Sequence, residues 1–264
     1  MDADLSLALR LADIADAMTL PRFRAADLRV TRKPDRTPVT DADTAAEDAL
    51  RAELAAQRPG DGVLGEERGG EVPESGRGWL LDPIDGTKNF SRGMPVWASL
   101  IALTVHGTPV VGVASAPGLG RRWWAAAGAG AWTTDAPGGE PRRIAVSSVA
   151  ELGDAYVSTT NAEVFRTHGT FDSWLALTER CWETRAFGDF WQHCLVAEGL
   201  IDVAVEPEAN SWDLAALQVI VEQAGGRLSD LAGVATFAGG DAISSNGLVH
   251  DASLACFRSG VSAA

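Results

Sequence analysis

The most restrictive feature of the sequence is the hexapeptide Asp82-Pro83-Ile84-Asp85-Gly86-Thr87, which directly follows an apolar run typical of a buried strand. Proline interrupts regular helical hydrogen bonding, so the chain cannot continue through this point as an ordinary helix. The turn should direct both aspartates into one space, with the Ile84 carbonyl between them. Hard oxygen ligands of this kind suit Mg²⁺. Because glycine permits close approach to the backbone, the amides of Gly86 and Thr87 can hold a phosphate.

Other acidic residues accompany this turn. Glu66 and Glu67 follow a short apolar run, and Asp213 lies in the first turn of a helix pattern. Asp43 and Glu47 are four residues apart and share one face of another helix pattern. Taken alone, each is explained by a solvated loop charge, a helix dipole or a polar helix face. Their joint presence with the Asp-Pro-Ile-Asp turn predicts a metal site built from several carboxylates.

The first part of the chain has the pattern of helices packed on a sheet. Apolar periodicity predicts helices over residues 4–19 and 41–57, and the polar, proline-rich segment 31–40 between them indicates an exposed loop. Short apolar runs separated by turns then predict strands near 63–64, 79–81, 96–105, 110–114 and 123–126. The sheet should be mainly antiparallel.

The second part alternates between strand and helix patterns, after a turn or linker at residues 135–141. The strand candidates are 154–159, 201–205 and 242–245, and the helix candidates are 170–181, 189–198, 211–224 and 250–258. Such alternation is typical of an α/β unit, so the fold class is α+β followed by α/β. We predict an N-terminal α+β subdomain over residues 1–140 with most metal ligands. A C-terminal α/β subdomain over 141–264 carries Asp213 and the substrate-specificity residues.

The charge of the chain bears on its partners. Its formal net charge is −14, which disfavours nucleic acid and anionic membranes. No apolar stretch is long enough to span a bilayer. The N-terminus has neither the basic region nor the apolar core of a signal peptide, so we expect a cytoplasmic protein. The three cysteines form no CxxC pair, which argues against a disulfide scaffold or a thiolate zinc site.

In combination, these motifs resemble the inositol-monophosphatase-like phosphatases. The resemblance covers nearly the whole chain and rests on the segments 38–43, 65–67, 79–90 and 212–216. It implies a layered α-β-α-β-α sandwich and a Mg²⁺-dependent phosphomonoesterase. It also implies a homodimer.

The resemblance further implies the metal and catalytic residues. The implied ligands of two or three Mg²⁺ ions are Glu66, Asp82, the Ile84 carbonyl, Asp85 and Asp213. Asp43 and Thr87 would position and activate the attacking water, and Glu66 belongs to the same catalytic set. Glu47 and Glu67 would stabilise these residues without being ligands themselves, and Glu47 would tune Asp43. A covalent phosphoenzyme is not expected.

Four further segments resemble the histidinol-phosphate phosphatase branch of this family: residues 59–67, 95–100, 121–126 and 185–190. The implied reaction is hydrolysis of L-histidinol phosphate to L-histidinol and phosphate in histidine biosynthesis. Asp85, Gly86 and Thr87 would contact the phosphate side of this substrate. Asp189 and Glu206 map to the substrate-facing region, where carboxylates suit an ammonium and an imidazole.

Three points stay open at this stage. Arg185 is a further substrate-binding candidate that could pair with Asp189 or face the phosphate. The first alternative function is a phosphatase for inositol 1-phosphate or another sugar phosphate. The second is a non-catalytic regulatory protein of the same fold, against which the complete set of motif residues argues.

Overall fold

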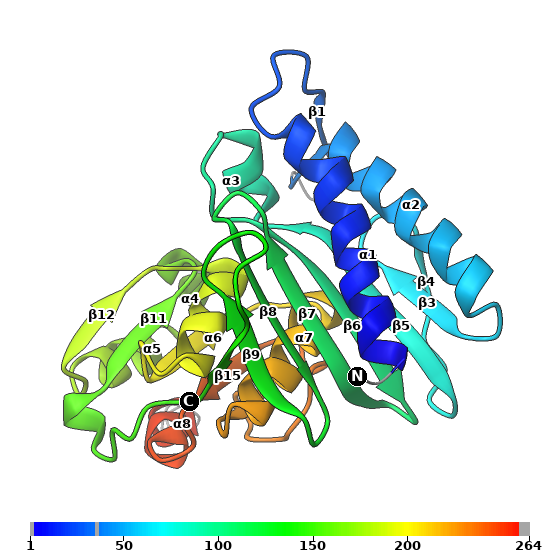
Figure 1. The fold of residues 1–264 in the computed structure, drawn as a ribbon. Coiled ribbons are helices and arrows are strands. Elements are labelled where there is room, and N and C mark those ends of the chain that lie inside the picture. The colour runs from blue at the N-terminus through cyan, green and yellow to red at the C-terminus, as the bar shows by residue number, and fades with distance from the viewer. Residues whose placement is uncertain (1–2, 35–36, 259–264) are drawn as a thin grey trace.

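The computed structural model describes residues 3–34 and 37–258, which form two large β-sheets and one two-stranded sheet (Figure 1). The larger sheet consists of β3 (Gly62–Gly65), β4 (Gly69–Glu71), β5 (Arg77–Asp85), β6 (Ala98–Val105), β7 (Thr108–Ala116), β8 (Arg121–Ala126), β9 (Gly130–Thr134) and β10 (Arg142–Ile144). Its strand order is β10-β9-β8-β7-β6-β5-β3-β4. All neighbours pair antiparallel except β3 and β5, which are parallel.

The smaller sheet is mixed. It consists of β11 (Tyr156–Thr159), β12 (Glu183–Arg185), β13 (Val203–Glu206), β14 (Arg227–Ser229) and β15 (Ala242–Ser245). The order is β12-β11-β13-β15-β14, with parallel pairing around β11 and antiparallel pairing around β15.

The helices form layers around the two sheets (Figure 1). They are α1 (Ala3–Thr19), α2 (Asp41–Gln57), α3 (Thr87–Ser91), α4 (Ala162–Thr167), α5 (Phe171–Thr178), α6 (Asp189–Ala197), α7 (Ser211–Gln223) and α8 (His250–Arg258). Helices α1 and α2 pack beside each other on the outer face of the larger sheet. Helices α6 and α7 lie between the sheets, and α4, α5 and α8 cover the smaller sheet from outside.

The alternation of side chains along β13 shows why the layers form. Val203 and Val205 belong to the outer apolar core with α4, α5 and α8, whereas Ala204 belongs to the middle core with α6 and α7. Successive strand residues point to opposite faces, so one strand serves two cores. The arrangement confirms the layered α-β-α-β-α sandwich that the sequence implied.

The segment expected to be an exposed loop contains two short strands, so this expectation was wrong in part. Strand β1 (Val30–Arg32) pairs antiparallel with β2 (Pro38–Thr40). The side chains of β1 are exposed, so no apolar alternation marks it in the sequence. By contrast, α1 and α2 begin and end within one residue of their predicted bounds.

Two further predictions concern the chain as a whole. Strand β10 follows the proposed boundary at residue 140 and joins the larger sheet, while the division into two subdomains stays a prediction. Within residues 3–34 and 37–258, no helix has the length and apolar character needed to cross a bilayer.

Candidate active site

The Asp-Pro-Ile-Asp turn lies at the end of β5, where the ladder with β6 is interrupted. Pairing runs regularly to Asp82 opposite Leu100 and resumes only with Asp85 opposite Ala98, which is the pattern of a bulge. The Asp82 Oδ1 accepts a hydrogen bond from the Ile84 amide at 2.9 Å. Gly86 then adopts a left-handed φ of 80°, which lets α3 begin at once.

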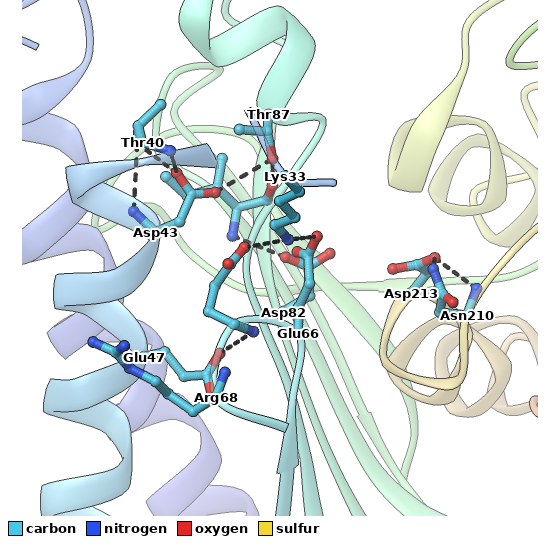
Figure 2. Close-up of polar contacts among 12 residues, drawn as sticks. Lys33, Thr40, Asp43, Glu47, Glu66, Arg68, Asp82, Thr87, Asn210 and Asp213 are labelled. Carbon is cyan, nitrogen blue, oxygen red and sulfur yellow. Dashed lines mark hydrogen bonds and ion pairs between the residues drawn. The ribbon is translucent and has the colours of Figure 1, made fainter. Parts of the chain in front are cut away.

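The bulge brings both aspartates into contact range of a third carboxylate. One oxygen from each of Asp82, Asp85 and Asp213 lies within 4.8 Å of the others. Asp213 belongs to the first turn of α7, and its Oδ2 accepts a hydrogen bond from the Asn210 amide at 2.7 Å. Figure 2 shows the Asp213 side chain on the side of Asp82, at the start of α7. The residues therefore meet from elements far apart in the sequence, as the combined motifs predicted.

The electrostatics of the cluster favour a bound cation. Burial raises the pKa values of Asp82 and Asp85 well above their usual range, and neighbouring carboxylates raise them further. Burial is also the main reason why the pKa of Asp213 rises to about 7. The donor set consists of oxygen atoms alone, which is the chemistry that hard divalent ions prefer. These residues fit a divalent metal.

Asp43 and Thr87 form the second part of the site. The Thr87 Oγ1 lies 2.9 Å from the Ile84 carbonyl oxygen and 3.3 Å from the Asp43 Oδ1 (Figure 2). The other Asp43 oxygen accepts hydrogen bonds from the amide and hydroxyl of Thr40, which caps α2. Burial raises the pKa of Asp43 to about 7, so this carboxyl can exchange a proton near neutrality.

Glu47 supports the loop that carries Glu66. It is fully buried, and its Oε2 accepts a hydrogen bond from the Glu67 amide at 2.7 Å, while Arg51 binds its Oε1. A Cβ atom at Gly65 would lie 2.1 Å from the Glu47 Oε1, so only glycine fits there. The hydrogen bonds of the Glu47 side chain come from Arg51 and from the loop amides of Glu67 and Arg68, and the predicted tuning of Asp43 by Glu47 stays a prediction.

Two lysines of the site were not singled out by the sequence analysis. Lys33 donates to the Glu66 Oε1 and the Glu67 Oε1, both at 2.7 Å (Figure 2). Burial lowers the pKa of Lys33, but the two glutamates more than offset this effect and raise it overall. Lys88 lines the cleft beside the cluster. Lys88 directly follows the Asp82–Thr87 motif, which was its only signal, whereas Lys33 is 33 positions from Glu66 and had no local signal.

A cleft of about 530 Å³ opens beside the carboxylate cluster. It is lined by Asp189 and Glu206, among others, in addition to Glu66, Asp85 and Asp213. Asp189 is the first residue of α6, and Gly188 is the N-cap of this helix. Glu206 ends β13. The structure therefore places both specificity candidates in one cavity with the candidate metal ligands.

Arg185 lies elsewhere. Its guanidinium binds the Glu183 carboxylate at 2.6 Å and the Thr184 carbonyl oxygen. It is not among the described residues that line the cleft. The role of Arg185 in substrate binding stays a prediction, without a contact to Asp189 among the described residues.

Comparison with known proteins places this geometry in a family. The model of the inositol monophosphatase family matches residues 2–259. The chain belongs to this family. A histidinol-phosphatase from Mycobacterium tuberculosis is 55% identical over 97% of this chain and 98% of its own length. One from Streptomyces coelicolor is 49% identical over 94% of both chains.

The solved structures of inositol monophosphatases support the same assignment. The fold matches an inositol monophosphatase from Zymomonas mobilis with a TM-score of 0.83, at 34% identity, over 98% of this chain and all of that one. The inositol monophosphatase family is metal-dependent, and the acidic cluster of this member agrees with that property.

Proposed function

We propose that this protein is a metal-dependent phosphomonoesterase that hydrolyses histidinol phosphate to histidinol and phosphate. The observation that carries the proposal is the cleft, in which a cluster of candidate metal ligands faces the additional carboxylates of Asp189 and Glu206. Such a cavity suits a phosphate ester with a cationic organic part. The names of the two similar histidinol-phosphatases support this substrate.

We propose Mg²⁺ as the metal, with two or three ions at full occupancy. The residues that would hold these ions are Glu66, Asp82, Asp85, Asp213 and the Ile84 carbonyl. When bound, such ions polarise a phosphoryl oxygen and lower the pKa of a coordinated water. The raised pKa values of the buried aspartates support the assignment, because a cation would relieve their mutual repulsion.

The chain's own residues would supply proton transfer and orientation. The Thr87 hydroxyl lies between Asp43 and the Ile84 carbonyl, where it can hold the attacking water. Asp43, with its pKa of about 7, would take up the proton that this water loses. The amides of Gly86 and Thr87 would donate hydrogen bonds to the phosphate oxygens, next to Asp85. Glu47 and Glu67 keep the Glu66 loop in place for the same reaction.

An inositol 1-phosphate or sugar-phosphate phosphatase is the second candidate. The likeness to the Zymomonas mobilis enzyme favours it, since that protein is named an inositol monophosphatase. Hydroxyl groups of a polyol could also donate to Asp189 and Glu206, but more weakly than a charged donor.

A substrate panel tests the proposal. Histidinol phosphate, inositol 1-phosphate and fructose 1,6-bisphosphate would be assayed with excess Mg²⁺ and, as a control, with EDTA. We expect kcat/KM for histidinol phosphate to exceed the others by about tenfold or more, a difference of 1.4 kcal/mol. A preference for inositol 1-phosphate would overturn the substrate. Absence of Mg²⁺-dependent phosphate release with every ester would favour the non-catalytic alternative.

We also propose that two copies of the chain form a homodimer through β12. Trp182, beside this edge strand, is 69% exposed and packs edge-on against Tyr156. Antiparallel pairing of two β12 strands about Thr184 would place Glu183 opposite Arg185 of the partner subunit, so the charges are complementary. Sedimentation should give the mass of a dimer for the wild type and of a monomer for Trp182→Lys. A monomeric wild type would contradict the proposal.

Other partners follow from the charge of the chain. Its net charge of −14 disfavours nucleic acid and anionic membranes. The small-molecule phosphate ester is proposed from the cleft and the family instead. Action in the cytoplasm stays a prediction from the sequence.

A further inference from the structure

Only one oxygen of the Glu206 carboxylate has hydrogen-bond partners among the described residues. Its Oε1 accepts hydrogen bonds from the Thr160 hydroxyl and from the Gln192 amide nitrogen. No residue in the described part of the chain donates to its Oε2. Glu206 lines the cleft. One oxygen is therefore fixed by the protein, and the other is left for a ligand.

The Thr160 hydroxyl links the Glu206 carboxylate to the backbone of Asp189. A hydroxyl has one proton to donate, and the proton of Thr160 points to Glu206. The same oxygen accepts a hydrogen bond from the Asp189 amide at 2.7 Å. A single hydroxyl at the end of β11 thus fixes the end of β13 relative to the start of α6.

The turn at Asp189 connects this pair to the candidate metal ligands. Asp189 adopts a left-handed φ of 49°, which is unusual for a residue other than glycine. The next amide, that of Phe190, donates to the Asp85 Oδ2 at 2.7 Å. The Asn89 side chain donates to the Asp189 Oδ2 at 2.9 Å. These contacts hold the Asp189 carboxylate beside the place where the phosphate would react.

Packing alone does not explain why Gln192 is buried. It lies on α6 with no exposed surface, and its Oε1 has no partner among the described residues. Burying an amide with an unpaired oxygen is unfavourable compared with an apolar side chain of similar size. Gln192 does not line the cleft, so it can act on a ligand only through Glu206.

We propose that Thr160 and Gln192 are positioning residues that set the substrate preference of this site. They orient Glu206 so that its free oxygen, together with Asp189, binds the cationic nitrogen groups of a phosphate ester. The inference rests on the proposed function and extends it to residues outside the family motifs. A charged N–H donor gains more from two buried carboxylates than a neutral hydroxyl does.

Steady-state kinetics with two esters test this inference. The Thr160→Val and Gln192→Leu variants would be assayed on histidinol phosphate and on glycerol 2-phosphate, which lacks a cationic group. We expect KM for histidinol phosphate to rise about tenfold, while its kcat and both constants for glycerol 2-phosphate stay within about twofold. Thr160→Ser keeps the hydroxyl and should restore the wild-type KM.

Thr159→Val is the matched control. Thr159 is the last residue of β11 and directly precedes Thr160; it is buried, but its hydroxyl has no partner among the described residues. This variant should leave the kinetics of both esters unchanged. An equal effect of Thr159→Val and Thr160→Val would show general disturbance of β11 and overturn the inference.

The outcomes separate the inference from the proposed function. If the wild type prefers histidinol phosphate and the variants keep that preference, the inference is wrong and the function stands. If the variants lose activity on both esters equally, their role is structural and the inference is again wrong. If the wild type shows no preference for histidinol phosphate, the proposed substrate fails and the inference falls with it. Gln192→Met provides a second variant should Gln192→Leu not fold.

Discussion

Replacing Asp213 by asparagine should stabilise the metal-free protein at alkaline pH. Burial raises the pKa of Asp213 from 3.8 to about 7. A carboxyl that holds its proton more tightly in the folded state makes a favourable contribution at low pH, and this contribution is lost as the pH rises through the folded pKa. Asparagine never ionises, and its side-chain oxygen can still accept the hydrogen bond from the Asn210 amide.

The magnitude follows from the pKa. A rise of about three pKa units changes the free energy of unfolding by about 4 kcal/mol in total. About 3 kcal/mol of this contribution is lost between about pH 4.5 and about pH 8. For a chain of this size, 1 kcal/mol changes the melting temperature by about 2–4 °C. Asp213→Asn should therefore melt about 6–12 °C higher relative to the wild type at pH 8 than it does at pH 4.5.

Thermal melts in EDTA at both pH values provide the assay. Asp172→Asn, in the exposed first turn of α5, is the control, and its effect on the melting temperature should be small and similar at both pH values. Saturating Mg²⁺ should stabilise the wild type at pH 8 and have a weaker effect on Asp213→Asn. A difference between Asp213→Asn and the wild type that does not change with pH would refute the reasoning.

Three further predictions follow from the same contacts. Asp43→Asn should lower kcat by about 100-fold or more, because the proton acceptor is lost, while phosphate binding measured by calorimetry stays unchanged. Lys33→Ala removes an ammonium that binds the Glu66 carboxylate, so half-maximal activation should need about fivefold less Mg²⁺ in a titration of activity; an increased requirement would contradict this. Glu198→Ala removes a buried carboxylate that binds Arg121 and Arg142, so unfolding in urea should show a loss of roughly 3 kcal/mol with KM unchanged.

Much of the candidate site was predictable because its residues occur in short segments at the ends of regular elements. A proline between two aspartates indicated the irregular turn that forms the bulge at the end of β5. The pattern of a helix start indicated the position of Asp213. Each segment has a local signal that can be recognised without knowing the fold. The layered architecture came from the family resemblance, since periodicity alone predicted only a sheet covered by helices and an α/β half.

Contacts between distant segments were not predictable from such patterns. Lys33 meets Glu66 across 33 positions of the chain, and β1, which leads to Lys33, has only exposed side chains. The short strands β4 and β10 also lacked an apolar pattern, because most of their residues are partly or fully exposed. Helical spacing related Glu47 to Asp43, but it could not indicate the hydrogen bonds that Glu47 accepts from the amides of Glu67 and Arg68, 20 and 21 positions further along the chain.

The position of α7 between the sheets has a consequence for synthesis of the chain. The larger sheet is complete once residue 144 has been made, yet one of its faces packs on α6 and α7. Until residues 211–223 leave the ribosome, that apolar face has no partner from α7, and a nascent chain in this state is prone to aggregation. Asp213 arrives with the same helix, so closure of the apolar core and completion of the carboxylate cluster occur in one late step.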